Sequence, residues 1–336
     1  MRFFQRKPRK NKKRQEALAV ARQGLPQHTA PMTRIIDGRR YYESAPYTLP
    51  KDLQDIHRLD FQHYMLRCAM RGNYLAPLDA TSTHNVLDVG CGSGRWGIEM
   101  AQAFPNTQVI GVDLEPAGSE GVEIPANYQF QQANVLHGLP FADQTFDYVH
   151  QRLLIMGIPK SQWITELQEV LRITRPGGWL ELLESGTTFM PAGELTQRWC
   201  EWGMRVSAAR GLDPSAAPNL ARFARQAGIQ QVQSYMFDIP VGNWGSILRG
   251  WEGRMGLMQL MNLRALYQSG LPLLKSELHI DELTLHTMLP RLEEEWARLH
   301  TKLRYFVVIG RKVEARDRPT RQTIHLTPPF ETRKER

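Results

Sequence analysis

Cysteine and long hydrophobic runs are both scarce in this chain of 336 residues. Its three cysteines, Cys68, Cys91 and Cys200, are too few and too scattered for a disulfide framework or a cysteine-based zinc site. No uninterrupted apolar stretch reaches the ~18 residues that span a bilayer, and near the N-terminus only 17–21 is apolar. We therefore expect a cytoplasmic chain with neither a membrane span nor a secretory leader.

Acidic residues are absent from residues 1–14, which hold eight basic ones. Because the whole chain carries a formal charge of +8, residues 15–336 are neutral. Residues 311–336 hold eight basic and four acidic residues, so a slightly acidic body lies between two basic tails. A run such as 1–14 is usually a solvated, disordered arm, and the sharper interpretation is a segment that docks on nucleic acid or an acidic surface. In a eukaryotic source, that second interpretation allows a nuclear location.

Hydrophobic patterning predicts an α/β chain. Residues 1–45 lack sustained periodicity, whereas 53–75 fit one apolar helical face. From 85 to 184 short apolar strands alternate with helices, which predicts a parallel sheet with helices on both faces. The expected strands are 85–89, 107–112, 128–132, 145–150 and 179–184, and the expected helices are 93–103 and 161–174, the second ending at Pro176-Gly177-Gly178.

The second half is less regular. We expect helices over 195–210, 216–227, 248–269 and 283–300, and strands over 229–241 and 303–313. The helical block between the last two strands, about 60 residues, is longer than an ordinary connection. Insertions of this size commonly build a substrate pocket or a dimer surface.

A glycine-rich loop follows the first strand, in the run Val-Leu-Asp-Val-Gly-Cys-Gly-Ser-Gly-Arg-Trp-Gly at 86–97. Residues 92–97 satisfy G-x-G-x-x-G, the dinucleotide fingerprint. However, Gly90 already occupies the turn after the strand, and Asp88 would repel a pyrophosphate. A carboxylate at this position suits an ammonium group, so the loop favours S-adenosylmethionine (SAM) over NAD.

Two further strand ends carry polar residues that suit a nucleoside. Asp113 lies about 20 residues past the glycine loop, where an acid accepts hydrogen bonds from both ribose hydroxyls. Asn134 follows the next strand and could hold the adenine edge. Each residue also has a purely structural interpretation, as a helix cap for Asp88, a turn for Asp113 and a loop for Asn134. Their occurrence at three successive strand ends favours the nucleoside site.

Residues 84–185 resemble the class I SAM-dependent methyltransferase domain and are similar to LaeA-like and UbiE-type methyltransferases. The resemblance is carried by the runs VLDVGCGSG, VIGVDLEP, QQANV, LPFADQTFDYVH and LQEVLRITRPGGWLELLE. It implies a Rossmann-like, mainly parallel seven-stranded sheet, with a helical lid before it and a helical insertion between the last two strands. It also implies SAM as methyl donor and S-adenosyl-L-homocysteine (SAH) as product.

The resemblance implies a set of cofactor-binding residues. They are Asp88, Gly90, Cys91, Gly92 and Gly94 in the methionine-binding loop, Asp113 and Leu114 at the ribose and adenine, Asn134 and Val135 at the adenine edge, and Gln151 and Arg152 along the methyl-donor cleft. The family usually has an acid where this chain has Asn134. The implied organisation is a basic arm and irregular lead-in at 1–45, a helical cap at 46–83, the SAM-binding core at 84–185, the rest of the sheet with the acceptor-binding insertion at 186–313, and a basic tail at 314–336.

The segment before the core is similar to that of LaeA-like methyltransferases, in the runs YTLPKD at 47–52 and RLDFQH at 58–63. This would place Arg58, Gln62 and His63 near the cofactor as a helical lid. A structural helix that packs its Leu59 and Met65 face on the sheet would need none of these polar groups.

The reaction itself asks little of the protein beyond alignment, because methyl transfer from a sulfonium is an in-line displacement. A base is needed only where the acceptor must first lose a proton. The weak candidates are His150 and His63, with Glu184 third, although a lone histidine is more often structural. No group of residues has metal-ligand spacing, so we expect no metal site.

Acceptor selectivity is expected from the C-terminal half of the chain. The candidate wall consists of Trp199, Trp202, Trp244, Trp251, Met255, Met258 and Met261, and an acidic acceptor would be held by Arg205, Arg249 or Arg254. Methionines at this spacing are more often core or dimer contacts. The oligomeric state stays open, a homodimer included.

Three functions stay open at this point. The first is methyl transfer to an O, N or C atom of a small molecule, in secondary metabolism if the LaeA-like similarity extends to the substrate. The second is methylation of a protein or RNA docked by residues 1–14, which the acidic body disfavours. The third is a non-catalytic SAM-binding regulator.

Overall fold

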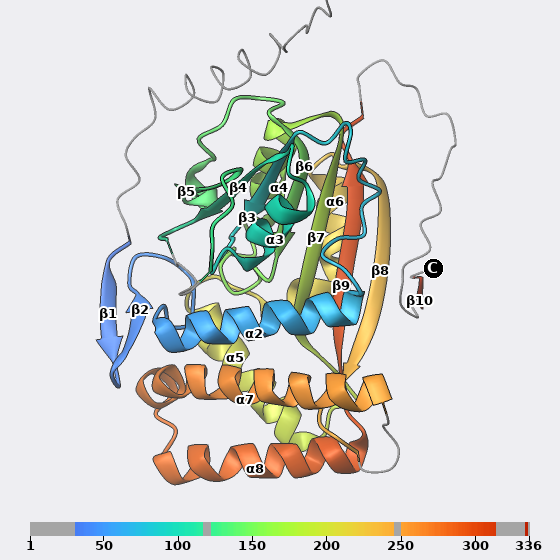
Figure 1. The fold of residues 1–336 in the computed structure, drawn as a ribbon. Helices are drawn as coiled ribbons and strands as arrows, with labels where there is room; N and C mark the ends of the chain where they lie inside the picture. Colours follow the sequence, from blue (N-terminus) through green and yellow to red (C-terminus); the bar gives the residue numbers. More distant parts are fainter. Residues whose placement is uncertain (1–30, 117–121, 245–249, 314–332, 335–336) are drawn as a thin grey trace, which may run out of the picture.

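The computed structural model describes residues 31–116, 122–244, 250–313 and 333–334 (Figure 1). The basic arm at 1–14 and most of the basic tail therefore lie outside the described residues. A twisted sheet of eight strands runs through the molecule in the order β10-β8-β9-β7-β6-β3-β4-β5. Its strands are β3 (Asn85–Val89), β4 (Gln108–Asp113), β5 (Tyr128–Gln132), β6 (Phe146–Arg152), β7 (Thr174–Met190), β8 (Gln230–Pro240), β9 (Lys302–Arg311) and β10 (Arg333–Lys334).

The strand directions confirm the Rossmann-like fold that the alternating pattern predicts. Strands β5, β4, β3, β6 and β7 are parallel neighbours, and β9 runs antiparallel between β7 and β8. The register pairs Asp88 with Gly111 on one side and with His150 on the other. The carboxyl ends of these strands therefore meet at one edge, where ligands bind in open α/β sheets. The eighth strand, β10, pairs two residues with β8 and was not expected.

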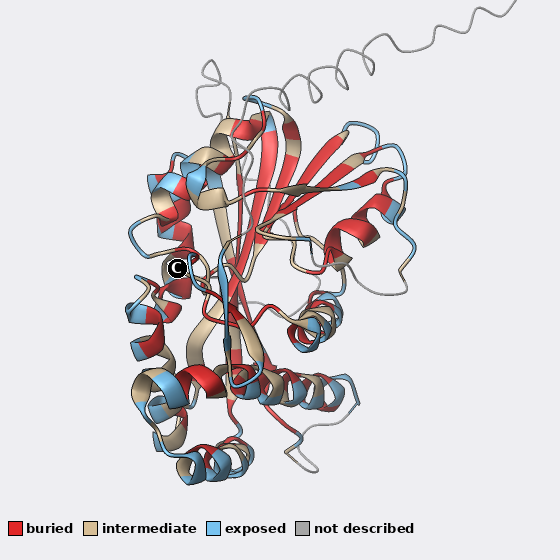
Figure 2. Cartoon of the chain, turned by 90° about the vertical axis from the view of Figure 1, so that its left-hand side faces the viewer, coloured by how far each residue is buried: buried red, intermediate tan, exposed pale blue. Residues whose placement is uncertain are grey.

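Helices cover both faces of the sheet, as predicted. On one face, α2 (Leu53–Met70) and α3 (Arg95–Ala103) share a buried apolar cluster with the sheet. On the other face lie α4 (Trp163–Ile173), the 3₁₀ turn η2 (Pro214–Asn219) and α6 (Leu220–Gln226). Buried residues fill the strands and the helix surfaces that contact them (Figure 2).

The expected insertion between the last two strands is a pair of long helices, α7 (Gly250–Leu278) and α8 (Glu282–Leu299). Figure 1 shows α2, α7 and α8 running side by side below the sheet, with α5 (Glu194–Ala208) behind them. Helix α7 continues through Pro272 to Leu278, past the predicted end at 269. Leu273 and Leu274 are buried there, so tertiary packing outweighs the local preference of proline to end a helix.

The predicted irregular lead-in contains an antiparallel hairpin, β1 (Thr33–Ile36) and β2 (Arg39–Tyr42). Asp37 and Gly38 both have positive φ, at 46° and 75°, which is the two-residue turn that Asp-Gly favours. The prediction of an irregular segment was therefore wrong here, and the Asp-Gly pair between β-branched and aromatic residues was the overlooked signal.

The Pro176-Gly177-Gly178 run does not separate α4 from the next strand as expected. Helix α4 ends earlier, at Ile173, and β7 begins at Thr174. The register against β6 then jumps from the pair Phe146–Thr174 to the pair Tyr148–Trp179. The run is thus an irregularity inside β7, and regular pairing resumes at the predicted start of the strand.

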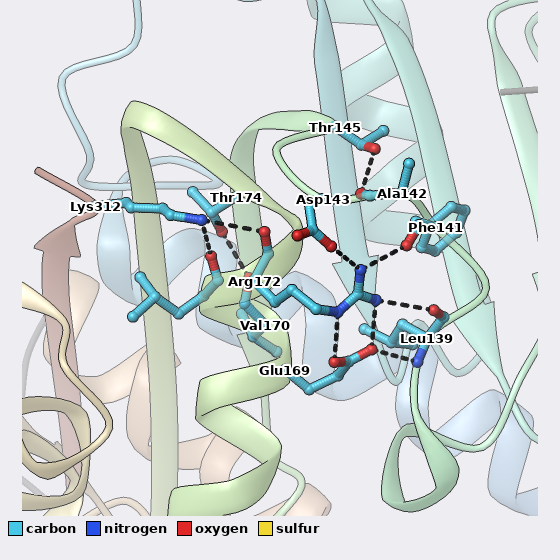
Figure 3. A network of polar contacts seen from close by, with 11 residues as sticks. Leu139, Phe141, Ala142, Asp143, Thr145, Glu169, Val170, Arg172, Thr174 and Lys312 are labelled. Carbon is cyan, nitrogen blue, oxygen red and sulfur yellow. Dashed lines mark hydrogen bonds and ion pairs between the residues drawn. The ribbon is translucent and has the colours of Figure 1, made fainter. Parts of the chain in front are cut away.

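A polar network ties the end of α4 to the loop before β6 (Figure 3). Arg172 donates to the carbonyl oxygens of Leu139 at 3.2 Å and Phe141 at 2.9 Å, and to Glu169 at 2.7 Å. Glu169 in turn accepts the backbone N–H of Leu139 at 2.7 Å. The network fixes the chain that follows the 3₁₀ turn η1 (Val135–His137) at the edge of the sheet.

Candidate active site

A first cavity opens at the carboxyl edge of the sheet, between the ends of β3, β4 and β6 and the roof formed by α2 and the chain after β2. Most of the residues implied for cofactor binding line it. They are Asp88, Gly90, Cys91, Gly92, Asp113, Leu114, Asn134, Val135 and Arg152. Gly94 and Gln151, from the same set, do not line it.

The glycines shape the floor of the first cavity. Gly90 has φ +66°, and a Cβ there would lie 2.3 Å from Leu154 Cδ2. Gly92 also has positive φ, at +55°. Gly94 has φ +79° and begins α3, but a Cβ there would meet Tyr128 Oη at 2.8 Å rather than the cavity. Gly94 thus makes room for Tyr128 and Gly90 for Leu154, and the positive φ at all three positions is a conformation that glycine adopts readily.

Asp88 is held in place by His150 on the neighbouring strand β6. Its Oδ1 lies 2.8 Å from His150 Nδ1, and the imidazole stacks on Trp96 with ring centroids 3.8 Å apart. Burial lowers the pKa of His150 and outweighs the opposing effect of Asp88. His150 is thus a neutral, buried ring that does not line the first cavity, which is the placement of a positioning residue and not of a base.

Asp113 lines the cavity with a carboxylate that is already held in place. Its Oδ2 accepts the Gly92 N–H at 2.8 Å, and its Oδ1 accepts the Leu114 N–H at 2.7 Å. Lys51 Nζ lies 3.5 Å from Oδ1. Burial opposes the charge of Lys51, but Asp113 and other nearby groups keep the pKa of Lys51 above its usual value. Sequence reasoning missed Lys51, because the run that contains it was considered only as a part of the lid.

Arg152 and His63 meet across the cavity from β6 and α2. Arg152 Nη2 donates to His63 Nδ1 at 2.8 Å, so the imidazole proton sits on Nε2, which faces Glu99 Oε1 at 3.2 Å. Burial lowers the pKa of His63. A neutral His63 thus positions the guanidinium of Arg152.

Gln151 lies between His150 and Arg152 on β6, and its side chain points to the opposite face of the sheet. Its Nε2 lies 3.4 Å from Glu166 Oε2, so the implied place of Gln151 in the methyl-donor cleft was wrong.

Asn134 has both the structural role and the position at the cavity that the sequence left as alternatives. Its Oδ1 accepts the Leu136 N–H at 3.0 Å and so caps η1, as the structural interpretation has it. The residue nevertheless lines the first cavity beside Val135. The cap fixes the direction in which the Asn134 amide meets a ligand.

The β1–β2 hairpin supplies part of the roof that sequence reasoning missed. Tyr42 lines the cavity, and Arg40 forms a two-pronged ion pair with Glu115 at 2.7 and 3.0 Å. Glu115 follows Asp113 and Leu114 in the loop after β4. The ion pair therefore fastens the hairpin to the loop that follows Asp113, over the first cavity.

The groups around the first cavity fit SAM. The Asp88 carboxylate and the Arg152 guanidinium, on neighbouring strands, match the ammonium and carboxylate of its amino acid part. The Asp113 carboxylate can accept about four hydrogen bonds, and two of these come from backbone N–H groups. The remaining two positions can accept bonds from two ribose hydroxyls. Leu114 and Val135 offer apolar contact for the adenine ring.

A second cavity adjoins the first. Its walls are the facing sides of α5 and α7 together with β7, and its roof is Arg58, Leu59 and Gln62 of α2. Four residues line both cavities, namely Tyr47, Leu59, Gln62 and Leu153. This junction lies where a methyl group carried by the first cavity would meet an acceptor in the second.

Most of the expected acceptor wall lies elsewhere. Trp199 lines the second cavity, but Trp202, Trp244 and the three methionines of the set do not. Met255 is a core residue, whereas Trp251 and Met261 are exposed. Arg205 and Arg254 are exposed and do not line the cavity, and Arg249 lies outside the described residues. The expectation assumed the wrong sides of α5 and α7.

None of the three candidate bases lines the second cavity. Glu184 accepts the backbone N–H groups of Leu154 at 2.7 Å and Ile155 at 3.2 Å, and burial raises its pKa well above the usual value. It does not line the second cavity, and neither does His63 or His150. Among the described lining residues of the second cavity there is no Asp, Glu or His. The described part of the chain also holds no cluster of His, Cys, Asp and Glu that could bind a metal.

Comparison with known proteins matches residues 86–178 to a family described as "Methyltransferase domain". The chain is 36% identical over 136 residues to methyltransferase str3 of Strobilurus tenacellus, a match that covers 40% of this chain and 47% of that protein. It is 31% identical over 221 residues to methyltransferase pytC of Aspergillus terreus, a match that covers 62% of this chain and 65% of pytC. The chain thus spans about half of str3 and less than two thirds of pytC.

A regulator is also similar. Secondary metabolism regulator LAE1 of Cochliobolus heterostrophus is 26% identical over 235 residues, covering 66% of this chain and 75% of LAE1. Among solved structures, geranyl diphosphate C-methyltransferase of Streptomyces coelicolor A3(2) covers 89% of this chain and 98% of its own, with 13% identity and a TM-score of 0.45.

Residues 86–178 thus match the methyltransferase-domain family within a Rossmann-like sheet, and the chain is similar to LaeA-like methyltransferases. No helix among the described residues has the length and apolar character needed to cross a bilayer.

Proposed function

We propose that this protein transfers the methyl group of SAM to a small molecule held in the second cavity. The observation that carries the proposal is the junction of the two cavities, which share Tyr47, Leu59, Gln62 and Leu153. A donor bound against Asp88 and Asp113 would present its methyl group toward this junction.

SAM supplies an electrophilic methyl carbon bonded to a sulfonium sulfur. A lone pair of the acceptor forms the new bond to that carbon, and the electrons of the carbon–sulfur bond return to sulfur, which leaves SAH. The protein's part is to hold the two molecules in line and to exclude water. No described residue in the wall of the second cavity is an acid or a histidine, so alignment and not proton removal is the contribution of that wall.

Two helix glycines support a small-molecule acceptor. Gly203 on α5 and Gly270 on α7 both line the second cavity, and a Cβ at either would have no protein atom within 4 Å. Glycine inside a helix is destabilising by roughly 0.5–1 kcal/mol relative to alanine. Two such residues on facing helices keep space open that the fold itself does not need.

The alternatives are less well supported. A mainly apolar cavity between facing helices, next to the cofactor cavity, suits a small molecule better than a polymer. The likeness to LAE1, whose name refers to secondary metabolism, supports an acceptor from that chemistry. A non-catalytic regulator would bind SAM and never turn it over.

Calorimetric titration of SAM and of NAD into the full chain tests the cofactor half. We expect SAM to bind, NAD not to bind, and both Asp88→Ala and Asp113→Ala to weaken SAM binding at least about tenfold, since each removes a charged partner. Binding of NAD, or SAM binding unchanged in both variants, would contradict the proposal.

The acceptor half is tested by filling the second cavity. A screen for SAH release with small aromatic and carboxylate compounds identifies an acceptor, and Gly203→Leu should then abolish turnover while SAM binding is kept. The matched control is Ala208→Leu, which adds the same side chain at an exposed position of the same helix. Turnover that survives Gly203→Leu and Gly270→Leu together would place the acceptor elsewhere.

A further inference from the structure

Three residues that line the second cavity each carry a buried polar atom without a hydrogen-bond partner among the described residues. The atoms are Thr48 Oγ1, Ser207 Oγ and Asn262 Oδ1. Their residues are almost wholly buried, with 3%, 0% and 2% of the surface exposed. Buried polar groups in folded proteins nearly always have partners, and a molecule bound in the second cavity would be able to supply them for these three residues.

The three atoms come from three separate parts of the wall. Asn262 lies on α7, Ser207 on α5, and Thr48 in the chain that leads into α2. The rest of the wall is mainly apolar, with Phe189, Trp199 and several leucines. An occupant must therefore be largely hydrophobic and carry polar groups only at a few points.

Asn262 sets the polarity of one of those points. A carbonyl oxygen of an amide only accepts hydrogen bonds, so the occupant must direct an O–H or N–H at Oδ1. The hydroxyls of Ser207 and Thr48 can donate or accept, and they set no such condition.

The charge of the cavity sets the charge of the occupant. Arg58 is the one charged side chain among the described lining residues, and it is paired with Asp55 by bonds of 2.6 and 3.2 Å. Although burial opposes ionisation, Asp55 keeps the pKa of Arg58 above its usual value. The pair is neutral as a unit, so a buried anion or cation in the occupant would find no free countercharge here.

We propose that the acceptor is a neutral, largely hydrophobic small molecule that donates a hydroxyl or N–H hydrogen bond to Asn262 Oδ1, with Ser207 and Thr48 binding its remaining polar groups. This inference rests on the proposed function and names the substrate class of the same site. Asn262 is on these grounds a specificity residue, remote from the cofactor groups.

The test uses the full chain saturated with SAH and two sets of matched probes, measured by calorimetry. One set is naphthol, its methyl ether and naphthoate, and the other is phenylphenol, its methyl ether and biphenyl carboxylate. In at least one set, the alcohol should bind about tenfold more tightly than the ether and the carboxylate. Two ring systems are used so that shape alone does not decide the result.

Asn262→Leu should reduce the preference for the alcohol to less than about twofold and leave binding of the ether unchanged. The control is Gln268→Leu, an amide-to-leucine change at an exposed position of the same helix, which should keep the preference. If Asn262→Leu does not fold, Ser207→Ala serves as the second variant and should weaken binding of the alcohol more than that of the ether.

The inference is overturned if the carboxylate binds most tightly, if alcohol and ether bind equally, if no probe binds, or if the preference survives in the folded Asn262→Leu protein. The titration that loads SAH separates the two proposals. Failure to bind SAH would defeat the proposed function, whereas failure of the probes on SAH-loaded protein defeats only this inference.

Discussion

Asp88 and His150 face each other across two paired strands, with Oδ1 and Nδ1 2.8 Å apart. The carboxylate that would meet the SAM ammonium is thus held by a ring that is itself stacked on Trp96. This arrangement makes His150 a positioning residue and separates it from the chemistry of the acceptor.

The first prediction concerns that pair. His150→Phe keeps an aromatic ring against Trp96 but removes the hydrogen bond to Asp88, and we expect SAM to bind about three- to tenfold more weakly, consistent with the loss of a bond worth ~0.5–1.5 kcal/mol. His150→Asn, whose amide can replace Nδ1–H, should restore most of the affinity and all of kcat. A loss of kcat in His150→Asn at unchanged KM for SAM would instead identify His150 as a base.

The second prediction concerns pH and His63. Because Nδ1 of His63 accepts from Arg152, SAM binding needs the neutral ring, and burial places its pKa below the usual 6.5. Affinity for SAM should hold near neutral pH and fall as the pH drops through this lowered pKa, when a cationic ring would face Arg152. His63→Gln can accept from Arg152 and donate to Glu99, so its affinity should change less with acidity. Calorimetry between about pH 7.5 and 5 measures both, and equal slopes would refute the assignment.

The third prediction concerns the hairpin. Arg40→Ala should weaken SAM binding modestly, because the Arg40–Glu115 pair fastens the hairpin to the loop that follows Asp113, over the first cavity. The pair is partly exposed, so its coupling should be only about 0.2–1 kcal/mol. A double-mutant cycle with Glu115→Gln, read as SAM dissociation constants, measures it. Additive effects would show that the two side chains do not act together.

The fourth prediction concerns Glu166, which lies beneath the sheet beside Gln151. Burial raises the pKa of Glu166 to about 8 from 4.5, so the folded protein keeps the proton over a range in which the unfolded chain has lost it. The free energy of unfolding should therefore decrease as the pH rises from 4.5 to 8, by up to about 1.4 kcal/mol per unit of pKa shift.

Glu166→Gln removes this titration and keeps a partner for Gln151. Urea unfolding should find the variant and the parent similar near pH 4.5 and the variant clearly more stable near pH 8. An equal difference at both pH values would mean that Glu166 is ionised in the folded protein. Glu181 titrates in the same way in both proteins, whereas Glu166 contributes to the raised pKa of Glu184, so the comparison reports Glu166 together with its coupling to Glu184.

The cofactor side of the site could be predicted from the sequence because it depends on a local rule. A buried strand followed by glycines, and an acid at the end of the next strand, place Asp88 and Asp113 at one edge of any parallel sheet. The same rule failed for Gln151, because successive side chains of a strand point to opposite faces of the sheet. Arg152 points to the face that lines the cavity, so its neighbour Gln151 points away from it.

The roof of the first cavity could be predicted only in part. The similarity to LaeA-like proteins placed Arg58, Gln62 and His63 near the cofactor; Gln62 and His63 line the first cavity, whereas Arg58 lines only the second. Lys51 and Tyr42 reach it through the path of the chain before α2, including the Asp-Gly turn of the hairpin. That path is fixed by contacts with residues far away in sequence, such as the pair of Arg40 with Glu115.

Sequence alone thus determined the fold class, the strand ends that line the first cavity and the presence of a helical insertion, because each follows from hydrophobic period and turn chemistry within a short stretch. The tertiary structure decided which side of α7 faces the second cavity. On α7 that side is Asn262, Leu266, Gly270 and Leu273, and not the expected methionines. A long helix with apolar residues around much of its surface can turn several sides inward, and only its packing against α2, α5 and α8 selects one.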